Sequence, residues 1–127
     1  MVDEQQTGER ISEAEHAVME ALWAASPLSA TDVADAVQAR EWSLATVKTL
    51  LSRLVAKQAI ATQPDGKRFL YTPLLARADY LGGESRRLVD RLFGGRAAPL
   101  FAQLAEAEAL SDADLSEIEA LLKELRK

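Results

Sequence analysis

The hydrophobic period changes twice along this chain of 127 residues, and that change limits the fold that the chain can adopt. Apolar residues recur at helical spacing from about residue 12 to residue 58, form two short β-favouring runs at 59–63 and 68–72, and return to helical spacing after Pro73. Pro64-Asp65-Gly66-Lys67 separates the two runs, and it favours a turn because proline presets φ and glycine supplies a positive φ. The pattern predicts a mainly α-helical chain with one small β-hairpin.

Three helices are expected before the hairpin, each behind a capping serine. Ser12-Glu13-Ala14-Glu15 is a capping box that starts the first helix, which Ser26-Pro27 closes. Ser29-Ala30-Thr31-Asp32 repeats the pattern before a short helix to about Ala39, and Ser43 caps a third helix to about Gln58. The chain thus has the element order of a winged helix-turn-helix: a short helix, a tight turn, a second helix and a basic hairpin. We therefore expect that fold.

The segment after Pro73 is expected to contain helices only. One helix should span residues 77–93, weakened by Gly82-Gly83 and ended by Gly94-Gly95, followed by a helix at 97–107 and a last helix capped by Ser111. We therefore expect a winged-helix domain at residues 1–75, in which residues 1–10 form a flexible tail, and a helical dimerisation domain at residues 76–127.

The helical tail has more apolar surface than two or three short helices bury among themselves. A second copy of the chain is the simplest cover, so a homodimer is expected. The residues assigned to this interface are Leu88, Leu92, Leu104, Leu115, Ile118, Leu122 and Leu125.

Several classes of protein are excluded by composition. The chain has no cysteine and one histidine, so disulfides, thiolate metal sites and cysteine nucleophiles are ruled out, and no nucleophile–base pair can be assembled. We expect no enzymatic activity, no bound metal and no cofactor. Since no apolar run is long enough to span a bilayer and residues 1–10 lack a secretory signal, we expect a cytoplasmic protein without direct membrane association.

Positive charge is concentrated in one part of an otherwise acidic chain. The whole chain carries a net charge of −5, yet residues 40–68 hold six basic residues and only two acidic ones. On the third helix, the face opposite the apolar stripe holds hydroxyls and basic groups but no acid. A helix with such a face fits the major groove of DNA. The expected DNA contacts are Ser43, Thr46, Lys48, Thr49, Ser52, Arg53 and Lys57, with Lys67 and Arg68 from the hairpin.

Other interpretations of the same residues remain open at this stage. The polar face of a surface helix is usually solvated, and a winged helix can also serve as a protein–protein interaction module that docks through its helical tail. A salt-dependent electrophoretic mobility shift with promoter DNA would distinguish DNA binding from protein binding. His16, Trp23 and Trp42 are assigned to packing, because the chain shows no metal-ligand spacing and no aromatic stacking platform.

The sequence resembles the penicillinase repressor family of transcriptional repressors, which control β-lactamase and methicillin-resistance genes. The resemblance lies in Ile11-Ser12-Glu13-Ala14-Glu15, Ala21-Leu22-Trp23 and Trp42-Ser43-Leu44-Ala45-Thr46-Val47-Lys48-Thr49-Leu50-Leu51-Ser52-Arg53-Leu54. It continues through Phe69-Leu70-Tyr71-Thr72-Pro73, Glu84-Ser85-Arg86-Arg87-Leu88-Val89-Asp90-Arg91-Leu92-Phe93-Gly94-Gly95 and Leu110-Ser111-Asp112.

The resemblance implies a homodimeric repressor that binds double-stranded DNA at a palindromic operator. It also implies relief of repression by proteolysis, driven by a membrane sensor metalloprotease that usually cuts an Asn-Phe bond. The matching pair here is Leu100-Phe101, which lacks the asparagine. Copper-responsive relatives use Cys-x-Cys motifs, and this chain has no cysteine to supply them.

Overall fold

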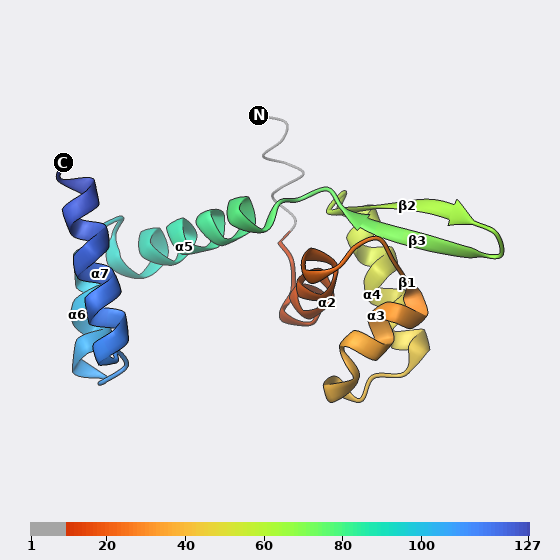
Figure 1. Cartoon of the computed structure of the whole chain (residues 1–127), viewed down its shortest axis with the longest axis horizontal. Helices are drawn as coiled ribbons and strands as arrows, with labels where there is room; N and C mark the ends of the chain where they lie inside the picture. The colour runs from red at the N-terminus through yellow and green to blue at the C-terminus, as the bar shows by residue number, and fades with distance from the viewer. Residues whose placement is uncertain (1–9) are drawn as a thin grey trace. The chain divides into compact units, whose positions relative to one another are not determined.

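A computed structural model of the chain describes residues 10–127. Helices and strands follow one another (Figure 1) in the order α2 (Glu13–Ala24), β1 (Leu28–Ser29), α3 (Ala30–Ala36), η1 (Gln38–Arg40), α4 (Leu44–Ala56), β2 (Ile60–Asp65), β3 (Arg68–Pro73), α5 (Arg77–Phe93), α6 (Ala98–Glu106) and α7 (Asp112–Leu125). The chain divides into two compact units, with the boundary between Tyr80 and Leu81. The first unit is a winged helix-turn-helix, so the predicted fold class is confirmed.

The core of the first unit lies between α2, α3, α4 and the start of β2. Apolar side chains at helical spacing meet there and lose contact with water, which is the main source of stability for so small a unit. The side chains without solvent exposure are Val18, Met19, Leu22, Val33, Val47, Leu51 and Leu54. Helix α4 therefore has one face fixed against the core and the opposite face free.

The sheet has three antiparallel strands in the order β1-β3-β2. Strand β1, with the pair Leu28↔Tyr71, was not predicted, because two residues are too few to show an alternating pattern. In the hairpin, Asp65 pairs with Arg68, so the turn is shorter than the sequence suggested and consists of Gly66 and Lys67. Gly66 has a φ of 66° at the first turn position, where a type II′ turn favours glycine.

The helix starts agree with the serine signals in the sequence. Ser12, Ser29 and Ser111 each close a capping box with the carboxylate three residues later. Each box satisfies two backbone amides that the helix geometry leaves without partners. The helices therefore begin where the sequence predicted.

The helix ends differ more from the prediction. Helix α3 stops at Ala36 and continues as the 3₁₀ turn η1, and α4 stops at Ala56, two residues early. Gln58 has a φ of 64°, and the amides of Gln58 and Ala59 donate to the carbonyls of Val55 and Leu54 at 2.9 and 3.0 Å. This is a Schellman ending with glutamine at the position that usually holds glycine, so no sequence signal marked it.

The second unit consists of the remaining helical residues from Leu81 onward. Helix α5 runs without interruption through Gly82-Gly83, and Gly94-Gly95 ends it with positive φ values of 59° and 87°. Helices α6 and α7 follow. Val89 is the one buried hydrophobic residue between residues 81 and 127, so this unit has almost no core of its own within one chain.

Candidate nucleic-acid interface

The free face of α4 holds most of the predicted recognition residues. Its buried side is formed by Val47, Leu50, Leu51 and Leu54, and all predicted contacts between residues 43 and 53 are exposed. They are Ser43, Thr46, Lys48, Thr49, Ser52 and Arg53. No acidic residue occurs between Leu44 and Ala56, so the face has a positive potential that suits a polyanion.

The hydroxyl of Ser43 is occupied at the N-terminus of α4. Its oxygen accepts from the Thr46 amide at 3.1 Å, and the hydroxyl donates to Thr46 Oγ1 at 3.1 Å. Ser43 thus caps the helix, as predicted, and its side chain has little capacity left for the phosphate contact that the sequence suggested. The positive end of the helix dipole remains exposed beside it and favours an anion.

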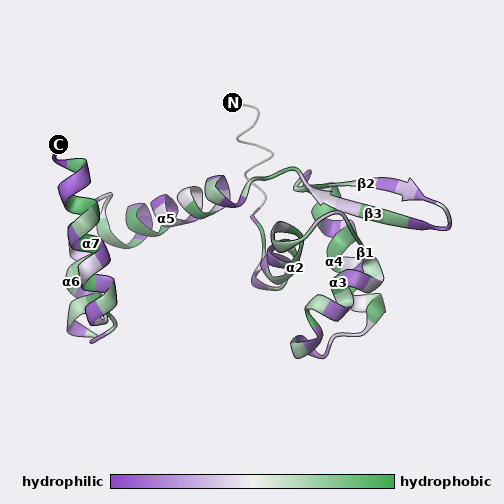
Figure 2. Cartoon of the chain, viewed as in Figure 1, coloured by the Kyte–Doolittle hydropathy of each residue, from purple (hydrophilic) through white to green (hydrophobic). Residues whose placement is uncertain are grey.

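The hairpin tip presents one basic residue without an intramolecular ion pair. Lys67 lies in the turn and is exposed, and the end of the hairpin is hydrophilic (Figure 2). Arg68 is positioned differently, since its Nε lies 3.1 Å from Asp65 Oδ2 in a half-exposed pair. The Ser29 amide and hydroxyl hold the pKa of Asp32 below its ordinary value, and the charge of Arg68 lowers that pKa further. Arg68 is therefore shared between carboxylates of the protein.

Lys57 has a role that the sequence did not indicate. Its Nζ lies 2.6 Å from Glu15 Oε1 and 2.6 Å from the Arg10 carbonyl oxygen, and its side chain is 19% exposed. Glu15 is 2% exposed. An ammonium held between two protein oxygens is not available to a phosphate, so the expected phosphate contact of Lys57 is revised to a link between α4 and α2.

Arg40 also belongs to the basic segment but is bound by the protein. It forms two hydrogen bonds to Glu13, at 3.2 and 2.6 Å, and its guanidinium lies 5.1 Å from the centre of the Trp42 ring. The sequence could not show this pairing, because 27 positions separate the two charged residues. Within residues 10–127, the basic residues of the segment without an ion pair are Lys48, Arg53 and Lys67.

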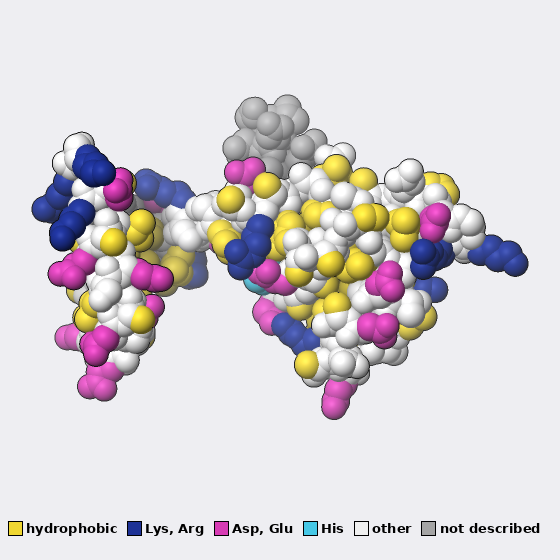
Figure 3. Space-filling model, viewed as in Figure 1, with side chains coloured by type: hydrophobic (Ala, Val, Ile, Leu, Met, Phe, Trp, Pro, Cys, Tyr) yellow, Lys and Arg dark blue, Asp and Glu magenta, His cyan; other side chains and the backbone are white. Residues whose placement is uncertain are grey.

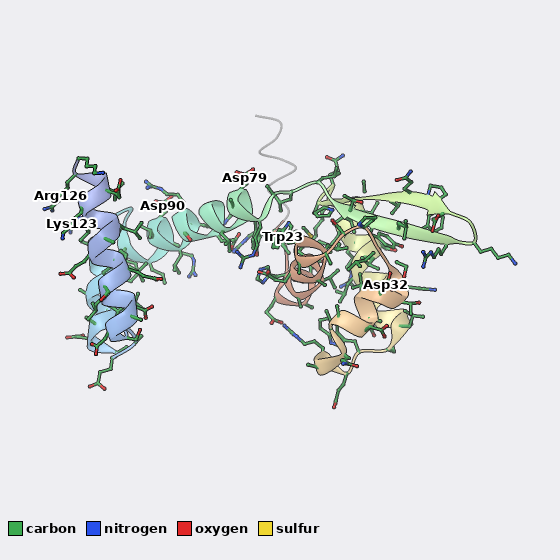
Figure 4. All side chains as sticks on the ribbon, viewed as in Figure 1. Trp23, Asp32, Asp79, Asp90, Lys123 and Arg126 are labelled. Atoms are coloured by element: carbon green, nitrogen blue, oxygen red, sulfur yellow. The ribbon has the colours of Figure 1, made fainter. Side chains whose placement is uncertain are left out.

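The lone histidine and one tryptophan pack between α2 and the first turn of α5. Trp23, labelled in Figure 4, donates from Nε1 to the Leu75 carbonyl oxygen at 2.8 Å. The His16 ring stacks on Tyr80 with 5.2 Å between centroids, and Glu20 lies 2.9 Å from His16 Nε2 and 3.0 Å from Arg77 Nε. These contacts fix the first turn of α5 on α2, so both rings have the packing role that the sequence gave them.

The residues assigned to the dimer interface are incompletely covered in one chain. Leu92, Leu115, Leu122 and Leu125 are exposed, by 47–80%, whereas Leu88, Leu104 and Ile118 are half-buried. Hydrophobic side chains are visible on the surface of α6 and α7 in Figure 3. The pair Leu100-Phe101 lies inside α6, with Phe101 44% exposed.

Residues 10–127 contain no helix that combines the length and the apolar character needed to cross a bilayer.

Known proteins resemble the chain over most of its length. A family model described as "Penicillinase repressor" matches residues 11–124. The penicillinase repressor of Bacillus licheniformis is 29% identical over 116 residues, which cover 91% of each chain. The methicillin resistance regulatory protein MecI of Mammaliicoccus sciuri is 31% identical over 113 residues, covering 88% of this chain and 92% of MecI. The solution structure of the DNA-binding domain of the repressor BlaI is 35% identical, with a TM-score of 0.51, covering 56% of this chain and 88% of that domain.

Proposed function

Since the chain belongs to the penicillinase repressor family and is a DNA-binding transcriptional repressor, we propose that it acts as a homodimer on a palindromic operator. The observation that supports contact with operator DNA is the free face of α4, where Lys48 and Arg53 are exposed, have no intramolecular ion pair and lie among hydroxyls without an acid. A winged-helix module that binds another protein would not need a face of α4 that holds basic residues and no acidic one.

The proposed contacts follow from the geometry of a helix in the major groove. Lys48 and Arg53 flank the free face and reach guanine edges or phosphates, Thr49 and Ser52 lie between them, and Thr46 lies beside Arg53 at the edge. Lys67 contacts the phosphate backbone from the wing. Arg68 can exchange Asp65 for a phosphate, because an exposed ion pair is weak.

The dimer is proposed to form through residues 81–127. The exposed leucines of α5 and α7 leave apolar surface that a second copy would cover, and at about 25 cal/mol per Å² a large apolar interface outweighs the cost of association. Two recognition helices related by a two-fold axis then meet half-sites about one helical turn apart, roughly 34–36 Å.

Repression in this proposal is steric, because the dimer occupies the promoter. Proteolysis at Leu100-Phe101 by a membrane sensor metalloprotease would remove α7 and most of α6 and so weaken the dimer. The bond lies in a helix, and a protease needs extended backbone, so α6 has to unfold locally first. The proposal places the protein in the cytoplasm and gives it no catalytic role or cofactor.

Selection from a library of random duplexes by the full chain tests the proposal. The expected result is a shared inverted repeat whose binding weakens steeply with added salt. Recovery of unrelated sequences, or of a single half-site that suffices for full affinity, would contradict the homodimeric operator complex.

A further inference from the structure

The middle of the free face of α4 is formed by Ala45, Thr49 and Ser52. They lie at positions i, i+4 and i+7 of the helix, on the side opposite the buried Val47 and Leu51. The N-terminal residues of a recognition helix reach furthest into the major groove. Ala45 and Thr49 are therefore the pair of side chains best placed to meet the floor of the groove.

The polar group of Thr49 is already used by the helix. Its Oγ1 donates to the Ala45 carbonyl oxygen at 3.1 Å, so its single hydroxyl proton is directed along the helix. Donation to a base edge would require rotation of the side chain and loss of this bond. The hydroxyl oxygen of Thr49 keeps only its capacity to accept, its methyl group has no assigned partner, and Ala45 offers only a methyl group.

Thr46, on the same helix, uses its hydroxyl in the opposite way from Thr49. Its Oγ1 accepts a hydrogen bond from the Ser43 hydroxyl at 3.1 Å, so the hydroxyl proton of Thr46 remains free to be donated. Thr46 and the flanking Lys48 and Arg53 can supply polar contacts at the edges of the face. Ala45 and Thr49, by comparison, place two methyl groups one turn apart near the centre of the face.

We propose that Ala45 and Thr49 form an apolar reading site for thymine methyl groups in the major groove. Thymine is the only base of DNA that presents a methyl group there, and alanine and threonine methyls are side-chain groups that contact it. The inference rests on the proposed DNA-binding mode and adds to it the base that the centre of α4 selects. The flanking basic residues contact bases and phosphates, and this pair adds discrimination in favour of thymine.

The test uses the full chain and a duplex that the chain itself has selected from a random library. Each thymine of a half-site is replaced in turn by deoxyuridine, which lacks only the methyl group. One replacement is expected to weaken wild-type binding about fourfold, which corresponds to one buried methyl group at about 0.8 kcal/mol.

Two matched variants separate the methyl group from the hydroxyl. Thr49→Val keeps the methyl group and removes the hydroxyl, and it should bind within twofold of wild type. Thr49→Ser keeps the hydroxyl and removes the methyl group. Because both subunits of the proposed dimer lose the contact, Thr49→Ser should bind about 16-fold more weakly. It should lose nothing further on the sensitive deoxyuridine duplex, because the same contact is already gone. Equal Tm values by circular dichroism provide the folding control.

The outcomes distinguish this inference from the proposed function. If Thr49→Ser binds like wild type while Thr49→Val is weakened, the hydroxyl reads the base and the inference is wrong. If no deoxyuridine position changes the affinity of a duplex that the protein binds specifically, the inference is also wrong although the proposed function stands. If the chain selects no common duplex, both fail.

Discussion

The Nζ of Lys57 lies 2.6 Å from Oε1 of Glu15, and the Glu15 side chain is almost completely buried. This pair joins the C-terminal end of α4 to the first turn of α2, where Glu15 also accepts from the Ser12 amide at 2.9 Å. One carboxylate thus serves both a helix cap and a contact between two helices. The contact adds a polar link between α2 and the recognition helix to the packing of their apolar faces.

Replacement of Lys57 by methionine should destabilise the protein by about 2–4 kcal/mol, because it leaves the buried carboxylate of Glu15 without its cation. Denaturant unfolding of the full chain measures the change. Lys48→Met is the matched control on the exposed face of the same helix and should change the stability by less than about 0.5 kcal/mol.

The two variants should differ in their effect on DNA binding. Lys57→Met should leave the dependence of affinity on salt unchanged at temperatures where it is folded, whereas Lys48→Met should weaken binding directly. If the affinity of Lys57→Met depends less steeply on salt concentration than that of the wild type, Lys57 contacts a phosphate and its assignment to Glu15 alone is wrong.

The pH dependence of stability should also reflect Glu15. Burial raises the pKa of Glu15, but the hydrogen bonds from Lys57 and the Ser12 amide lower it by more, so the pKa lies below the ordinary value of 4.5. A carboxyl with a lowered pKa in the folded state stabilises the fold above its unfolded pKa, and that contribution is lost as the pH falls through the folded pKa.

Thermal unfolding between pH 6 and pH 2.5 measures this loss. The difference in Tm between wild type and Glu15→Gln should be largest near pH 6 and should shrink below about pH 4.5, because Gln cannot titrate. Glu13, Glu20 and Asp32 also have lowered pKa values and titrate in both proteins, so the difference isolates Glu15. A constant difference across this range would show that the charge of Glu15 contributes nothing.

The local signals in the sequence predicted the helix starts, and contacts between distant residues explain what was missed. A capping box such as Ser12 with Glu15 acts over three residues and can be identified without knowing the fold. The same Glu15 meets Lys57 across 42 positions, and only the packing of α2 on α4 brings the two together. The sequence shows how many basic residues the segment 40–68 holds, but it does not show which of them the protein neutralises.

Strand β1 and the end of α4 were missed for a related reason. Leu28 and Ser29 become a strand only because β3 lies beside them, and Gln58 adopts a left-handed φ without the glycine that usually marks such an ending. The exposed face of α4 follows instead from hydrophobic periodicity and the end of α5 from Gly94-Gly95, which are local signals and were predictable.

Truncation should separate DNA contact from dimer formation. A fragment of residues 1–80 retains the buried core of the first unit and should be a folded monomer, because the apolar residues assigned to the interface are absent. It should bind the full operator much more weakly than the whole chain, since each half-site is then bound independently. Sedimentation and anisotropy titrations measure both properties. A dimeric fragment with full operator affinity would place the interface elsewhere.

The central claim is that the free face of α4 reads operator DNA, and the specificity ratio of a double variant tests it most directly. The ratio compares the affinity for the selected duplex with the affinity for a scrambled duplex at fixed salt. The wild type should reach a ratio of about 10³ or more, and Lys48→Ala/Arg53→Ala should fall at least tenfold below it with an unchanged Tm, because both side chains are exposed. A double variant that folds and keeps the wild-type ratio would contradict the claim.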